Sequence, residues 1–137
     1  MDTPQLLKSL NDHKVRYVII GASAFPVHGY SRATLDIDIF VDPTPENAQN
    51  TIQALKDYGY DVTDLSVDDL LSKKILIRGY AVESDFHPFV TGVSSFNEIW
   101  QSAIAGDIFG VPTRFADLDS LIKMKQAAGR PKDLEDL

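Results

Sequence analysis

The chain has 137 residues, a length that can bury a hydrophobic core as one domain without disulfides or metals to hold it together. It contains no cysteine, which excludes a disulfide framework, a thiol nucleophile and a thiolate zinc site and fits a cytoplasmic, reducing compartment. The formal net charge of −7 argues against broad, charge-driven binding to nucleic acid, and no apolar stretch approaches the roughly 18 residues that a membrane-spanning helix needs.

The first elements along the chain are a helix, a strand and a glycine turn. The spacing of three leucines predicts a helix over residues 5–12, with Thr3 as its N-cap and Pro4 in its first turn. A β-branched apolar run then predicts a strand over residues 15–20. A glycine turn ends this strand and opens a short helix that stops near residues 28–29.

A second strand, expected over residues 35–41, carries two aspartates. Side chains two apart share a face of a strand, so Ile37 and Ile39 point into a core while Asp36 and Asp38 point the other way. Aspartate is disfavoured within strands, and neighbouring carboxylates call for a compensating cation such as Mg²⁺. The alternative is a solvated edge strand whose outer face happens to be acidic.

The middle of the chain predicts one long helix and a hairpin. Thr44 caps a helix that has Pro45 in its first turn and runs to about Tyr58, where Gly59 ends it. The segments that follow are a weak strand, a helical or irregular stretch and two strands joined by a glycine turn, at residues 60–63, 64–71, 75–78 and 81–87.

The last third of the chain predicts two more helices and a strand pair. Ser94 or Ser95 caps a helix that is expected to continue through Ile104. Then come two short strands around a glycine, a helix with an aspartate cap and a final turn, over residues 107–109, 111–115, 117–129 and 132–137. We therefore expect a single α/β (α+β) domain over residues 1–137, with a mixed central sheet flanked by helices and C-terminal helices at about 117–137.

An anion site is expected beside the acidic strand. The turn at Gly21 and Ala22 supplies backbone N–H groups at a helix N-terminus, where phosphates bind, and Ser23 adds a hydroxyl donor. Arg32 and Thr34 come just before the acidic strand. An anion site and a cation site within one unit suit a metal-bound nucleoside triphosphate.

The pattern G-x-x-A followed by H-G-x-x-R-x-T-x-D-I-D-x-x-V resembles the minimal nucleotidyltransferases of the polymerase-β superfamily, in the branch that includes the abortive-infection toxin nucleotidyltransferases. The matching residues are Gly21, Ala24, His28-Gly29, Arg32, Thr34, Asp36-Ile37-Asp38 and Val41. A basic pattern over residues 121–134 resembles the segment that closes such domains, so the resemblance covers almost the whole chain. The family usually has Gly-Gly or Gly-Ser where this chain has Gly21-Ala22. The resemblance implies a polymerase-β-like nucleotidyltransferase fold.

The resemblance also implies a third carboxylate on a later strand, for which Asp85 is the choice and Glu83 the alternative. His87 shares their face and is expected to be a structural hydrogen-bonding residue. Asp36, Asp38 and Asp85 would be both catalytic residues and ligands of two Mg²⁺ ions roughly 3.5–4 Å apart, for which Mn²⁺ can substitute. The ions would activate an acceptor hydroxyl and stabilise the pyrophosphate that leaves the NTP.

The nucleotide-binding residues that the resemblance implies are Gly21, Ala22, Ser23, Arg32, Thr34, Lys125 and Lys132. For Lys125, Arg130 and Lys132 the alternative is a solvated basic helix end, which the helix dipole favours. Lys73 and Lys74 are expected to be solvated.

The implied activity is transfer of a nucleoside monophosphate from an NTP to a hydroxyl of an RNA end, a protein or a small molecule. The family branch adds a toxin–antitoxin or phage-defence setting, in which a homodimer or an antitoxin is the protein partner. We expect no membrane partner. The alternative hypothesis is a catalytically decayed binding module of the same fold, serving as an antitoxin or scaffold.

Overall fold

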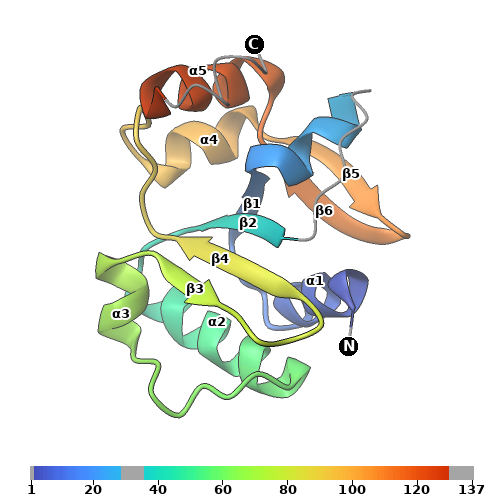
Figure 1. The fold of residues 1–137 in the computed structure, drawn as a ribbon, viewed down its shortest axis with the longest axis vertical. Helices are drawn as coiled ribbons and strands as arrows, with labels where there is room; N and C mark the ends of the chain where they lie inside the picture. Colours follow the sequence, from blue (N-terminus) through green and yellow to red (C-terminus); the bar gives the residue numbers. More distant parts are fainter. Residues whose placement is uncertain (1, 29–35, 130–137) are drawn as a thin grey trace.

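A computed structural model describes residues 2–28 and 36–129, and its centre is a six-stranded mixed sheet (Figure 1). The strands are β1 (Tyr17–Ile20), β2 (Asp36–Val41), β3 (Ile75–Ile77), β4 (Glu83–His87), β5 (Ile104–Ile108) and β6 (Val111–Phe115). The helices are α1 (Thr3–Asp12), the 3₁₀ helix η1 (Gly21–His28), α2 (Pro45–Tyr58), α3 (Val67–Ser72), α4 (Phe96–Ser102) and α5 (Leu118–Ala128). This confirms the expected mixed α/β class.

The strands follow the order β3-β4-β2-β1-β6-β5. The β2–β4 and β1–β6 pairs are parallel, and the remaining neighbours are antiparallel. Helices α1, α2 and α3 lie on one side of the sheet, whereas η1, α4 and α5 lie on the other (Figure 1). The parallel β2–β4 pair brings together two strands that are far apart in the sequence, and this pairing builds the site described below.

Strand β2 separates an apolar face from an acidic one. Ile37, Ile39 and Val41 are all buried, as their alternation predicts. Phe40 shares the face of the aspartates but is also buried, because the ring of Phe96 in α4 packs edge-on against it with centroids 5.1 Å apart. The acidic face is therefore covered at its Phe40 end and open toward its aspartates.

The predicted boundaries of α2 and α5 are confirmed. The Thr44 hydroxyl accepts the N–H of Asn47, and Gly59 ends α2 with a φ of 121° that favours glycine. Asp117 caps α5 in the same way, and Gly129 ends that helix in the left-handed region. Capping side chains and glycines are local signals, so the sequence carries them without knowledge of the rest of the fold.

The start of α1 differs from its prediction by one residue. Asp2, rather than Thr3, is the N-cap, because its carboxylate accepts the N–H of Gln5 (2.9 Å) while the Gln5 side chain accepts the N–H of Asp2 (3.1 Å). This reciprocal pair satisfies two backbone donors where a threonine cap would satisfy one.

Two further predictions are wrong. Residues 60–63 form no strand: the N–H of Asp61 donates to the Tyr80 hydroxyl and the N–H of Thr63 donates to the Asp61 carboxylate, so neither N–H is available to pair with a neighbouring strand. Ile104 does not extend α4, which ends at Ser102; it opens β5 instead, paired with Phe115 of β6. Within the described ranges, no helix has the length and apolar character that crossing a membrane requires.

Candidate active site

One row of residues crosses four strands of the sheet. Asp38 of β2 is paired with Ile20 at the end of β1 and with Asp85 of β4, and Asp85 is paired in turn with Leu76 of β3. Paired residues on neighbouring strands point to the same face, so the two carboxylates face the same side. The row therefore joins the last residue before the glycine turn to two acidic side chains.

A third side chain completes a cluster around these carboxylates. A carboxylate oxygen of Asp38, one of Asp85 and a ring nitrogen of His87 all lie within 4.8 Å of one another. Nε2 of His87 is 3.0 Å from Oδ1 of Asp38. The Asp38 side chain is 30% exposed and that of Asp85 only 11%, so the cluster is open to solvent at Asp38 and covered at Asp85. Two carboxylates and an imidazole are a donor set that suits a divalent metal ion.

The remaining candidate carboxylates form a second pair, two residues earlier on the same two strands. Asp36 of β2 is aligned with Glu83 of β4, and both precede the cluster by two residues on the same face. An oxygen of Glu83 accepts the N–H of Gly79 (3.0 Å) in the turn between β3 and β4. The cluster of possible ligands therefore contains Asp85, the first choice for the third carboxylate, and neither Asp36 nor Glu83.

The glycine turn lies directly against Asp38. Gly21 has a φ of +67°, and a Cβ at this position would lie 2.8 Å from Oδ2 of Asp38. Only glycine adopts this conformation without strain and leaves that carboxylate oxygen room. The chain thus brings the start of η1, with its backbone N–H groups, to the edge of the acidic cluster.

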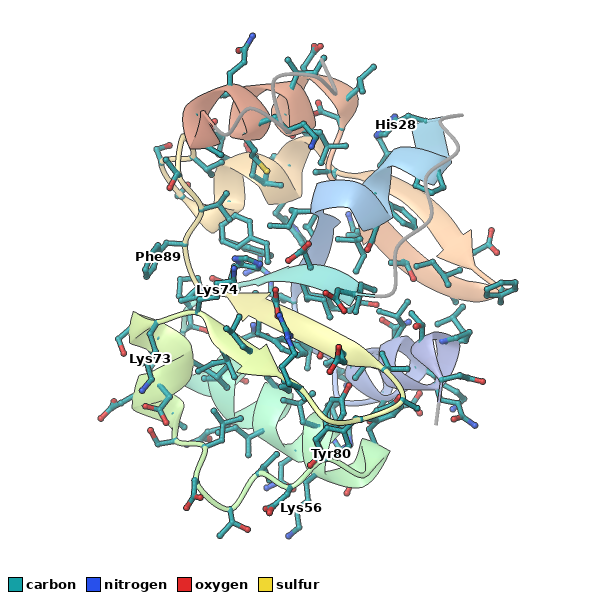
Figure 2. The ribbon with its side chains drawn as sticks, in the orientation of Figure 1. His28, Lys56, Lys73, Lys74, Tyr80 and Phe89 are labelled. Carbon is teal, nitrogen blue, oxygen red and sulfur yellow. The ribbon has the colours of Figure 1, made fainter. Side chains whose placement is uncertain are left out.

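The hydroxyl of Ser23, expected to bind phosphate, has a structural partner. It donates to the carbonyl oxygen of Asp36 (3.0 Å) and so holds η1 against β2. The other end of η1 is held by His28, whose Nε2 donates to the carbonyl oxygen of Ala116 (2.9 Å), beyond β6 (Figure 2). Ser23 and His28 therefore fix the position of the helix that follows the glycine turn.

Two cations that the sequence did not single out for the site contact Asp85. Nη1 of Arg78 donates to Oδ1 of Asp85 at 2.6 Å, and Nζ of Lys74 lies 3.9 Å from Oδ2. The hydrogen bond to Asp85 is the largest cause of a raised pKa of Arg78, and the charges of Asp85, Asp36 and Glu83 add to it. Arg78 thus provides positive charge next to the acidic residues.

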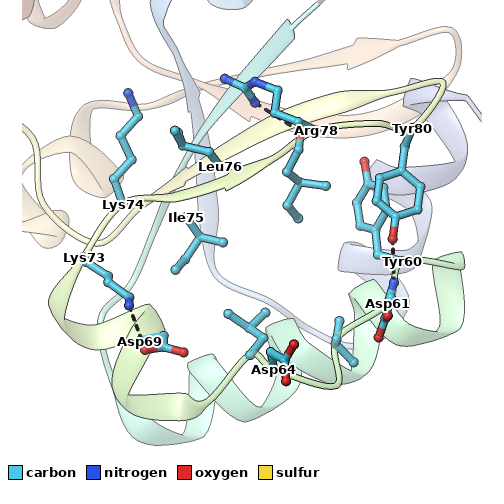
Figure 3. A pocket seen from close by; sticks show the side chains of 13 residues that line it. Tyr60, Asp61, Asp64, Asp69, Lys73, Lys74, Ile75, Leu76, Arg78 and Tyr80 are labelled. Atoms are coloured by element: carbon cyan, nitrogen blue, oxygen red, sulfur yellow. Dashed lines mark hydrogen bonds and ion pairs between the residues drawn. The ribbon is translucent and has the colours of Figure 1, made fainter.

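Strand alternation explains how these cations reach Asp85. Lys74, Leu76 and Arg78 leave the β3 segment together, on the side away from Ile75 (Figure 3). Because Leu76 is aligned with Asp85, the two basic residues flank it from the diagonal positions. Lys73 and Lys74 were expected to be solvated, and both side chains are exposed. Lys74 also lies near Asp85, and Lys73 pairs with Asp69 (3.3 Å).

Of the remaining residues expected to bind the nucleotide, only Lys125 lies within the described ranges. Lys125 lies in the last turn of α5, and α5 packs against η1. The other predicted residues, Arg32 and Thr34 before β2 and Lys132 after α5, lie outside the described residues, as does Arg130.

Two cavities in the described part of the chain are lined by none of Asp38, Asp85 and His87, although Lys74 and Arg78, which contact Asp85, help to line the first. One, of about 390 Å³, is lined by Tyr60, Asp69 and Ile75 among others, between β3 and the segment that leads into α3 (Figure 3). The other, of about 630 Å³, is lined in part by Trp100 and Arg114. Trp100 is half-buried and packs against the core, with the guanidinium of Arg114 4.2 Å from its ring centre.

A mixed sheet that carries paired carboxylates on adjacent strands, next to a glycine turn and a helix start, is an arrangement consistent with the nucleotidyltransferase class. The chain belongs to the family described as "Nucleotidyltransferase of unknown function (DUF6036)", whose model matches residues 2–137. The comparison with curated proteins gave no match.

Proposed function

We propose that this chain is a metal-dependent enzyme that transfers a nucleoside monophosphate from an NTP to a hydroxyl acceptor. The observation that carries the proposal is the alignment of Asp38 with Asp85 across β2 and β4, directly beside the turn at Gly21. Membership of a nucleotidyltransferase family supports it independently. We also propose that residues 1–137 act as one domain, because the buried apolar side chains of residues 2–28 and 36–129 form one cluster.

Asp38 and Asp85 would hold the metal, with Asp36 as a further carboxylate on the same face. The residues fit such an ion, because their oxygens converge and Gly21 leaves Oδ2 of Asp38 accessible at the glycine turn. A divalent ion in this position supplies a Lewis acid that activates a hydroxyl and neutralises a leaving pyrophosphate. We propose Mg²⁺ or Mn²⁺ for this role.

The protein's own groups would position the nucleotide. Backbone N–H groups at Gly21, Ala22 and Ser23 offer donors to the phosphates at the start of η1. Arg78 is half-exposed beside Asp85. When a metal ion replaces it at the Asp85 carboxylate, its guanidinium can turn toward the triphosphate. Lys125 and the three residues outside the described ranges, Arg32, Thr34 and Lys132, stay predictions for the same task.

This arrangement needs no covalent intermediate on the protein. An acceptor hydroxyl, which gives up its proton to water, attacks the α-phosphorus; the new P–O bond forms, and the bond to pyrophosphate breaks in line with it. The basic residues, and the metal ion that the carboxylates would hold, stabilise the negative charge that develops on the phosphate oxygens during that displacement. The proposed acceptor is an RNA end, a protein or a small molecule, and the proposed setting is a toxin–antitoxin or phage-defence system in the cytoplasm, both suggested by the family resemblance.

The test compares two labelled forms of each NTP, incubated with the protein, Mg²⁺ or Mn²⁺ and a panel of RNA, protein and small hydroxyl acceptors. We expect label from the α-phosphate to enter an acceptor and label from the γ-phosphate to leave as pyrophosphate. Transfer of the γ-label to the acceptor would contradict nucleotidyl transfer and indicate a phosphotransferase.

Three variants make this test specific to the site. Asp38→Asn and Asp85→Asn remove one carboxylate charge each and should lower transfer by about 100-fold or more. Asp12→Asn is the matched control, because Asp12 pairs with Lys8 on the surface of α1, on the other side of the sheet, and it should transfer like the wild type. Wild-type transfer by Asp38→Asn, or NTP binding without any transfer, would overturn the proposal; the second result would favour a decayed binding module.

A further inference from the structure

His87 belongs to the cluster, but the transfer proposed above does not use it. It follows Asp85 by two residues in β4, so the two side chains share a face. Its side chain is only 16% exposed, and its Nε2 is 3.0 Å from Oδ1 of Asp38. A nearly covered imidazole therefore points at the carboxylate that is proposed to bind metal.

The spacing of these atoms suits coordination as well as hydrogen bonding. Two ligand atoms at right angles around an octahedral ion, with bonds of about 2.1 Å, lie about 3.0 Å apart. The Nε2 to Oδ1 distance matches this edge, and an oxygen of Asp85 lies within 4.8 Å of both atoms. To take up an ion, the Asp85 carboxylate would have to give up its hydrogen bond from Arg78 (2.6 Å) and move slightly toward the other two ligands.

We propose that His87 coordinates the metal through Nε2, together with Asp38 and Asp85, and that the site therefore prefers Mn²⁺ to Mg²⁺. This inference rests on the proposed function and specifies its cofactor. Mg²⁺ favours an all-oxygen shell, whereas an imidazole nitrogen raises the affinity for ions further along the transition series.

The competing role for His87 is to orient Asp38 by a hydrogen bond, without contact to the ion. Neighbours of that kind also affect metal affinity, so a loss of binding alone does not separate the two roles. Direct detection of a nitrogen on the metal does separate them.

The experiment titrates Mn²⁺ alone into the full chain and follows the free ion by electron paramagnetic resonance. Pulsed measurements on the bound ion then detect the nitrogen coupling of a directly coordinated imidazole, and isotope-labelled histidine assigns it without any substitution. The variants are His87→Gln and, as a matched control, His13→Gln, since His13 pairs with Asp57 away from the cluster. Mg²⁺ affinity is measured by competition in the same samples.

We expect a histidine nitrogen coupling in the wild type and in His13→Gln, and none in His87→Gln. We also expect His87→Gln to bind Mn²⁺ about tenfold more weakly or worse, with Mg²⁺ affinity changed less than about threefold. Bound Mn²⁺ without nitrogen coupling in the wild type, or with the coupling intact in His87→Gln, would overturn His87 as a ligand and leave the proposed function standing. No binding of Mn²⁺ with or without NTP would overturn the proposed function itself.

Discussion

Gly21 sets how closely the end of β1 approaches Asp38. Replacing it with alanine adds a Cβ that would lie 2.8 Å from Oδ2 of Asp38, at a φ of +67° that disfavours a side chain. We predict that Gly21→Ala loses about 1–2 kcal/mol of stability and about 100-fold of transfer activity, because the carboxylate must move. Urea unfolding and the α-label assay measure the two effects.

Gly110 offers the matched control for Gly21. It has a φ of +85°, but nothing lies within 4 Å of the Cβ that an alanine would add. Gly110→Ala should therefore show the backbone strain without the loss of transfer. Equal activity of the two variants would contradict a role for the glycine turn at the site.

At the scale of residues, sequence alternation put Asp36 and Asp38 on one face, and the family resemblance pointed to Asp85, which the register of β2 and β4 places beside Asp38. Neither could reveal Arg78 or Lys74, because their contacts with Asp85 depend on the register between β3 and β4. That register follows from the turn between the two strands and from the packing of the sheet. Alternation through Lys74, Leu76 and Arg78 was the one signal in the sequence that these cations share a face.

Asn47 of α2 connects three elements through its buried amide. Its Oδ1 accepts the N–H of Arg16 (2.7 Å), and its Nδ2 donates to the carbonyl oxygens of Arg16 (3.1 Å) and Asp42 (2.9 Å). We predict that Asn47→Ala lowers the free energy of unfolding by about 1–3 kcal/mol, since the Arg16 N–H loses its acceptor, whereas the carbonyl oxygens of Arg16 and Asp42 keep the N–H groups of Asp42 and Thr44. Chemical denaturation tests this, with the exposed Gln49→Ala as a control expected to stay within about 0.5 kcal/mol of the wild type.

Glu98 links the start of α4 to α5. Its pKa is lowered from 4.5 to about 2, first because the Ser94 hydroxyl donates to it, and then because of Lys123 and the Ser94 N–H. A carboxyl group whose pKa falls on folding stabilises the protein above its unfolded pKa and loses that contribution as the pH falls toward its folded pKa.

The Glu98→Gln variant tests this link between α4 and α5. We predict that it is less stable than the wild type near neutral pH and that the difference shrinks as the pH falls from about 4.5 to about 2. Urea midpoints at a series of pH values measure the difference. A gap that stays constant over that interval would show that the charge of Glu98 does not contribute.

At the scale of elements, the prediction succeeded where the signals are local and failed where they are not. The caps of α2 and α5 and the hairpin of β3 and β4 were expected from capping residues and glycines. The end of α4 was missed, because no glycine or proline precedes Ile104 and the pairing with Phe115 decides its conformation. The two hydrogen bonds between Asn47 and Arg16 were equally out of reach, since Arg16 is 31 residues away.

For the whole molecule, the net charge of −7 includes the acidic residues of the site. Binding of a divalent cation there should stabilise the fold, because the unfolded chain does not assemble the site. We predict that Mn²⁺ at about ten times its dissociation constant adds about 1.4 kcal/mol and raises the Tm by about 4 °C. Thermal unfolding with and without the ion measures this shift.

The same melting experiment separates the site from general charge screening. Asp38→Asn should lose most of the Mn²⁺-dependent shift, whereas Asp12→Asn should keep it, although each variant removes one negative charge. Equal shifts in both variants would mean that the ion acts on the overall charge and not on the cluster.

The most direct measurement is a crystal structure of the protein with Mn²⁺ and an NTP analogue that cannot be cleaved at the α-phosphate. We predict anomalous density for manganese between the carboxylates of Asp38 and Asp85, with the triphosphate against the turn at Gly21. A nucleotide bound elsewhere, such as in the cavity beside Trp100, with no manganese at these carboxylates, would contradict the account.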